Sequence, residues 1–164
     1  MAILVESGRA AVATAIKNQP IHLAWGEGDP TWDQIPAPGK PEDINTTVLV
    51  KELGRRTVRP PQFCIPDANG TIQVSAGRFS LTANNTPSKY LYLNFMFELD
   101  DAPTATIREL GIFVGSQVSA TPAKVDYFLP SEVSDPGQLL VLEYIDGLKR
   151  STSIRQQFEF VIQF

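Results

Sequence analysis

A strict two-residue alternation from Tyr90 to Leu99 is the feature that most limits how this chain can fold. One face of the segment carries only large apolar side chains: Leu91, Leu93, Phe95, Phe97 and Leu99. Such alternation is typical of a β-strand with one buried face, because successive side chains of a strand point to opposite sides. Full burial of each side chain would contribute roughly 1.5–3 kcal/mol of transfer free energy. We therefore predict that this segment is the central core strand of a β-protein.

Further strands follow from the spacing of turn residues and apolar runs after Gly54. Turn signals recur at intervals of about ten residues, which is typical of all-β folds. The short connection at residues 100–103 predicts that Thr106–Val114 returns as the antiparallel neighbour of Tyr90–Leu99. The Phe-rich C-terminal strand is expected to pair within the sheet. We predict a mainly β fold, either an antiparallel β-sandwich or an open barrel.

The N-terminal part departs from this β pattern in two ways. Residues 6–18 are rich in alanine and predict one short α-helix that ends before Pro20. Residues 26–45 contain four prolines and three glycines, which exclude a helix or a central strand. A loop of this length is usually functional or bound to a partner. Trp32 and Ile35 suggest that it is pinned to a surface.

The length of 164 residues fits one domain. We expect a single domain over residues 1–164, made of three successive parts. These are an N-terminal helical element (1–20), a region with a strand, the long loop and a short helix (21–56), and the β core (57–164).

Residues for catalysis or metal binding are scarce. Nucleophilic catalysis needs a base beside the nucleophile, and His22 is the single histidine, in an apolar strand context. The single cysteine, Cys64, excludes an internal disulfide and reads as a buried hydrophobe. Glu27, Asp29 and Asp33 could hold a hard cation, but their spacing does not match an EF-hand. We predict no enzymatic activity, no cofactor and no metal.

Charge and hydropathy limit the partners. The net charge of −4 argues against a nucleic-acid groove, which needs clustered Lys and Arg. We interpret the only basic cluster, Arg55, Arg56 and Arg59, as pairing with a partner or with carboxylates. No signal peptide and no apolar run of membrane-spanning length is evident. We expect a soluble protein made in the cytoplasm and no membrane insertion.

Four charged residues stand within apolar segments: Glu52, Arg55, Arg108 and Glu109. A buried charge needs a partner, so we predict a structural charge network that joins them. The alternative is that these side chains simply face solvent on an edge strand.

Three segments, in this order along the chain, carry a resemblance to a known family. The first is His22–Asp33, which contains Trp-Gly-Glu-Gly-Asp, and the second is Val48–Val58, which contains Glu52, Gly54 and Arg55. The third is Thr104–Gly115, which contains Ile-Arg-Glu-Leu-Gly-Ile-Phe. Together with the N-terminal helix, these segments resemble tail and baseplate proteins of tailed bacteriophages, specifically those with contractile tails. The resemblance covers most of the chain, and its motifs are structural.

The resemblance implies a virion structural protein of the tail tip or baseplate, acting as an assembly component or as an adaptor between baseplate and tail fibre. Its partners would be other tail and baseplate proteins and the tail fibre, with multiple copies in a symmetric assembly. We assign the interaction residues as Trp25, Trp32, Ile35, Arg55 and Arg56. The alternative function is a carbohydrate-binding module in which Trp25, Trp32 and nearby tyrosines stack on sugar rings.

Overall fold

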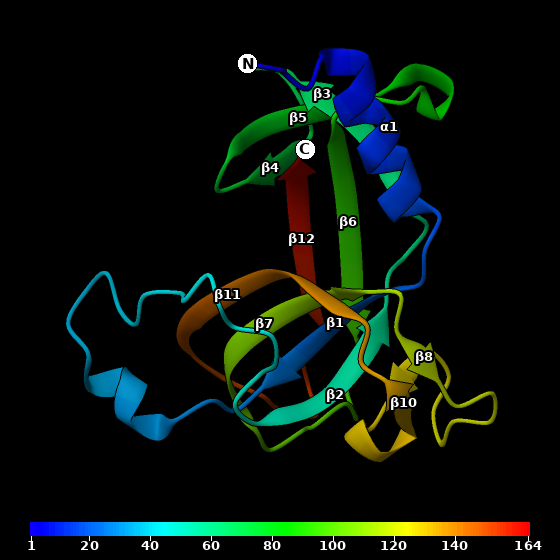
Figure 1. Cartoon of the computed structure of the whole chain (residues 1–164). Coiled ribbons are helices and arrows are strands. Elements are labelled where there is room, and N and C mark those ends of the chain that lie inside the picture. The colour runs from blue at the N-terminus through cyan, green and yellow to red at the C-terminus, as the bar shows by residue number, and fades with distance from the viewer. The chain divides into compact units, whose positions relative to one another are not determined.

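The computed structural model describes residues 1–164 and confirms the predicted class, which is mainly β with antiparallel sheets and an N-terminal α-helix (Figure 1). The chain forms two units, which are described separately. Unit 1 comprises Met1–Gln19, Val58–Phe95 and Gln157–Phe164, and unit 2 comprises Pro20–Thr57 and Met96–Gln156. That the whole chain is a single domain stays a prediction.

The sheet of unit 1 is built around the strand with the strict alternation. Its strand order is β12 (Gln156–Gln163), β6 (Tyr90–Phe97), β3 (Gln62–Pro66), β5 (Gly77–Leu81) and β4 (Ile72–Val74). Leu91, Leu93 and Phe95 of β6 are fully buried, as the alternation predicts. The C-terminal strand β12 pairs with β6, so its expected internal pairing is confirmed.

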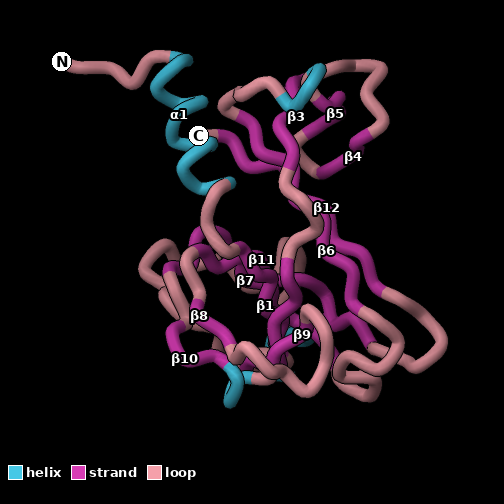
Figure 2. The backbone as a smooth tube through the Cα atoms, turned by 90° about the vertical axis from the view of Figure 1, so that its right-hand side faces the viewer, coloured by secondary structure: helices cyan, strands magenta, loops and turns pink.

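The helix of unit 1, α1 (Glu6–Lys17), is only lightly packed. Ala13 is its one buried residue, while Val12 is exposed. Lys17 lies over the ring of Phe63, with Nζ 5.8 Å from the ring centroid. The remaining helical residues are short 3₁₀ turns, η1 (Pro30–Gln34), η2 (Ala83–Asn85) and η3 (Pro130–Glu132), as Figure 2 shows in cyan. No helix is both long and apolar enough to cross a membrane.

Unit 2 holds a second five-stranded antiparallel sheet. The strand order is β11 (Gln138–Lys149), β7 (Thr106–Val114), β1 (Ile21–Gly26), β2 (Glu52–Thr57) and β9 (Tyr127–Phe128). A two-stranded sheet of β8 (Gln117–Val118) and β10 (Val133–Asp135) accompanies it. The central strand β1 is buried along its whole length. In its core, the ring of Trp25 stacks on Phe97 with centroids 3.6 Å apart.

The predicted hairpin of Tyr90–Leu99 with Thr106–Val114 is wrong. Strand β6 pairs with β3 and β12, whereas β7 pairs with β1 and β11 in the other sheet. The connection is anchored by the buried Asp101, whose carboxylate accepts the Glu98 N–H (2.8 Å) and lies near the cations of Arg56 and Lys124. The connection makes two successive turns, in which the Asp101 N–H donates to the Glu98 carbonyl (3.2 Å) and the Ala105 N–H to the Ala102 carbonyl (3.2 Å), and not the single tight turn of a hairpin. Leu99, which was expected in the core, is 38% exposed.

The short helix expected after the long loop is also absent. Residues 46–51 are irregular and lead directly into β2. The N–H groups of Val50 and Lys51 donate to a side-chain carboxylate of β7, and both residues therefore stay outside a helical hydrogen-bond ladder.

We predict that Phe95→Ala lowers the free energy of unfolding by about 3–5 kcal/mol, because it empties a fully buried site beside Phe160. Ile65→Ala, at an exposed position of the same unit, should change it by less than about 1 kcal/mol. Chemical denaturation measures both. Equal effects of the two substitutions would contradict the core assignment.

Candidate interaction surface

The connection between β1 and β2, residues 27–51, contains the predicted long loop and is called here the β1–β2 loop. Both of its ends are bound to one buried side chain, Glu109 of β7. The Glu109 Oε1 accepts the N–H of Lys51 (2.7 Å) and of Gly28 (3.3 Å), and Oε2 accepts the N–H of Val50 (2.9 Å). Three amide donors compensate the burial of this carboxylate and close the base of the loop.

The glycines of the Trp-Gly-Glu-Gly-Asp stretch make room for these contacts. A Cβ on Gly26 would lie 2.3 Å from Glu109 Oε1. A Cβ on Gly28 would lie 2.3 Å from the ring of Trp32, and Gly28 has φ +57°, a conformation that favours glycine. The stretch is therefore explained by close approach to Glu109 and Trp32.

A second anchor holds the 3₁₀ turn of the loop. Arg108 forms a two-pronged ion pair with Asp33, from Nε to Oδ1 and from Nη2 to Oδ2, both at 2.7 Å. Its Nη1 donates to the carbonyl of Glu27 (3.1 Å). The hydrogen bond from Arg108 lowers the pKa of Asp33, and the same bond raises the pKa of Arg108. Paired charges of this geometry add orientation as well as energy.

The structure distributes the four predicted network residues over separate contacts. Arg55 pairs with Glu52, from Nε to Oε1 at 2.6 Å and from Nη2 to Oε2 at 3.0 Å, and lies 3.8 Å over the Phe113 ring. Arg108 reaches Asp33, and Glu109 reaches backbone amides. Sequence reasoning missed Asp33 as the partner of Arg108, because the two residues are far apart in the chain and no local spacing connects them.

Of the five assigned interaction residues, two are enclosed within unit 2. Trp25 and Arg55 are buried, and in this structure neither offers a surface to a partner or to a sugar ring. Arg56 is half-buried and donates to the carbonyls of Met96 (2.8 Å) and Val125 (3.0 Å). Trp32 is half-buried and Ile35 is exposed, and both lie on the β1–β2 loop.

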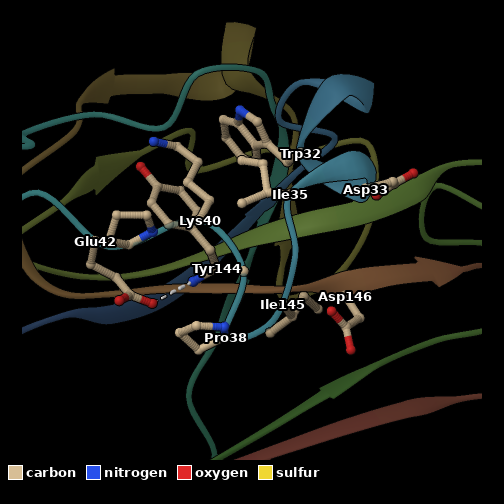
Figure 3. Close-up of a pocket in the computed structure, with 11 residues that line it drawn as sticks. Trp32, Asp33, Ile35, Pro38, Lys40, Glu42, Tyr144, Ile145 and Asp146 are labelled. Carbon is tan, nitrogen blue, oxygen red and sulfur yellow. Dashed lines mark hydrogen bonds between the residues drawn. The ribbon is translucent and has the colours of Figure 1, made fainter.

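A pocket of about 260 Å³ opens between the loop and the middle of β11 (Figure 3). Its walls include Trp32 and Tyr144, whose ring centroids are 4.8 Å apart at an interplanar angle of 61°. The Glu42 carboxylate accepts the N–H of Tyr144 (3.2 Å) and ties the loop to the strand. Burial raises the pKa of the Tyr144 phenol, against a smaller lowering by its hydrogen bond with Thr46.

Beyond its anchors, the loop presents apolar side chains to solvent. Leu49 is buried and packs with Ala24 and Phe113. In contrast, Ile35, Ile44, Val48 and Val50 are exposed, and Ile44 is 98% exposed. The loop is thus fastened to unit 2 while its apolar groups face outward.

The whole chain, residues 1–164, matches the family model described as "Baseplate wedge 3 tail fiber network component". The chain belongs to this family. It is therefore a structural component of a bacteriophage baseplate and tail-fibre network, as the resemblance in the sequence implies. Comparison with individually curated proteins gives no significant match.

The buried His22 of β1 gives this baseplate component a measurable response to acid. Its Nδ1 has no hydrogen-bond partner, and its ring meets the edge of Phe128 at 5.5 Å. Burial, and secondly the charge of Arg55, lower the pKa of His22 to about 4. The imidazole is therefore neutral near pH 7.

We predict that the free energy of unfolding falls as the pH drops from about 6.5 toward 4. In this window the unfolded chain protonates His22, whereas the folded chain does not. His22→Gln should remove this pH dependence between pH 6.5 and 5, where few carboxylates titrate. An NMR titration that places the pKa of His22 near 6.5 in the folded protein would contradict the prediction.

Proposed function

We propose that the protein is an assembly adaptor of the baseplate, and that its β1–β2 loop docks on a neighbouring subunit of the tail-fibre network. The observation that carries the proposal is that one loop is fixed to its own subunit by buried side chains and also exposes several apolar side chains to solvent. Glu109 and Arg108 fix the loop, while Ile44, Val48 and Val50 stay exposed.

Exposed apolar groups on a fixed loop favour association for two reasons. Covering them removes apolar surface from water, which stabilises a complex by about 25 cal/mol per Å². In addition, a loop that is already held by its own subunit loses little conformational freedom on binding. The adaptor is proposed to act in multiple copies, without nucleic acid or membrane insertion.

The charged side chains around the loop favour a structural role over a catalytic one. Asp33 is paired with Arg108, and Lys51 forms an ion pair with Glu27. Glu109 is committed to three backbone amides. These groups are engaged in holding the loop, which supports a structural role for them.

The direct test is Ile44→Asp, which places a charge in the proposed contact. Because Ile44 is almost fully exposed to solvent, the isolated Ile44→Asp variant should keep the melting temperature of the unchanged protein. Incorporation into tails should fall at least tenfold when the variant is the sole copy of the chain. Deletion of the loop would be less informative, because it also removes Asp33 from Arg108.

Val125→Asp is the matched control, since Val125 is an 81% exposed apolar residue of unit 2 outside the loop. It should assemble normally. If tails form equally well with Ile44→Asp, and also with Val48→Asp, the loop is not the docking surface.

A further inference from the structure

The pocket between the loop and β11 already contains an ammonium group. Lys40 Nζ lies 5.1 Å from the centroid of the Trp32 ring and 4.7 Å from that of Tyr144 (Figure 3). Two aromatic rings thus share one cation. The faces of aromatic rings carry negative potential, and such positions attract ammonium groups.

We infer that the Trp32–Tyr144 pocket is a binding site for a lysine side chain of a neighbouring subunit, and that Lys40 is its internal occupant. This inference rests on the proposed docking role of the loop, and adds the chemistry that the partner must supply.

The lining of the pocket suits both the ammonium group and the hydrocarbon stem of a lysine side chain. The aromatic rings take the ammonium, and the apolar walls of Ile35, Pro38 and Ile145 suit a hydrocarbon stem. The carboxylates of Glu42 and Asp146 also line the pocket, so its electrostatic potential favours a cation over an anion. A neutral or acidic side chain would lack the favourable charge interactions with the rings and the carboxylates.

The contacts of Lys40 with the pocket are cation–π contacts. Lys40 has no ion pair, whereas Lys51, Lys89 and Lys124 each pair with a carboxylate. Its ammonium lies over the two rings, and its charge also interacts electrostatically with the nearby Asp43.

Because Lys40 belongs to the same loop, it competes as an intramolecular ligand with a high effective concentration. A free ligand must overcome this competition, but a subunit docked on the loop would present its own lysine at a comparable effective concentration.

The test uses the full chain and n-butylammonium, which reproduces the end of a lysine side chain. In Lys40→Ala, the NMR signals of the Trp32 indole and the Tyr144 ring should shift saturably with this probe. The apparent affinity should be at least fivefold higher than in the unchanged protein, where Lys40 competes. The neutral 1-pentanol should bind at least fivefold more weakly than n-butylammonium.

Lys17→Ala is the matched control, because Lys17 also lies over a ring, that of Phe63 in unit 1. It should leave the response at Trp32 unchanged. In the double variant Lys40→Ala/Tyr144→Leu, with the fold checked by the amide spectrum, the selectivity for the cation should fall, because one of the two rings is lost while Trp32 and the carboxylates remain.

If Lys40→Ala binds n-butylammonium no better than 1-pentanol, or binds neither, the cation site is refuted. That result would leave the docking role intact, since the role is tested separately by Ile44→Asp. Conversely, normal assembly of Ile44→Asp would refute the docking role while cation binding by Lys40→Ala could still be measured.

Discussion

The buried Glu109 carboxylate is the contact on which the arrangement of unit 2 around the loop depends. It takes the amides of Gly28, Val50 and Lys51, so the residues that leave β1 and those that enter β2 meet at one side chain. The requirement for glycine at position 26 follows from the same oxygen, which leaves no room for a Cβ. Removal of the carboxylate would leave the buried amide of Gly28 and the partly buried amides of Val50 and Lys51 without their acceptor. An unsatisfied buried amide costs about 1–3 kcal/mol.

The neighbouring residue Arg108 completes the anchoring. Adjacent side chains of a strand project to opposite faces, so Arg108 and Glu109 hold the loop from two sides of β7. Arg108 fixes the 3₁₀ turn through Asp33, and that turn carries Trp32 to the pocket. The Ile-Arg-Glu-Leu-Gly-Ile-Phe segment of this baseplate family member therefore has a structural role. Its two charged side chains, Arg108 and Glu109, hold the β1–β2 loop in place.

The sequence was most informative where local periodicity decides the structure. The alternation in β6 identified Leu91, Leu93 and Phe95 as core, because a strand with one buried face has no other pattern. The proline and glycine content of residues 26–45 likewise indicated a long loop, and within it the structure has only the short 3₁₀ turn Pro30–Gln34 and the last residue of β1, Gly26. Both inferences need only neighbouring residues.

Contacts between distant residues were not predictable in the same way. Turn length alone suggested that β6 and β7 pair, but each pairs with other strands, in different sheets. The pairing of Arg108 with Asp33 and the burial of Trp25 also depend on the tertiary fold. At the candidate site, the sequence predicted the loop and its Trp32 as an interaction surface, which stays a prediction, while the amides that Glu109 binds and the position of Lys40 over two rings required coordinates.

Amide hydrogen exchange in Glu109→Gln is the most direct measurement of this account. Glutamine keeps the size of the side chain but removes its charge and replaces one acceptor oxygen with a donor. The amides of Val50 and Lys51 should then exchange at least tenfold faster than in the unchanged protein, while the amides of β6 in unit 1 keep their protection. Unchanged protection of Val50 and Lys51 would contradict the claim that Glu109 holds the loop in place.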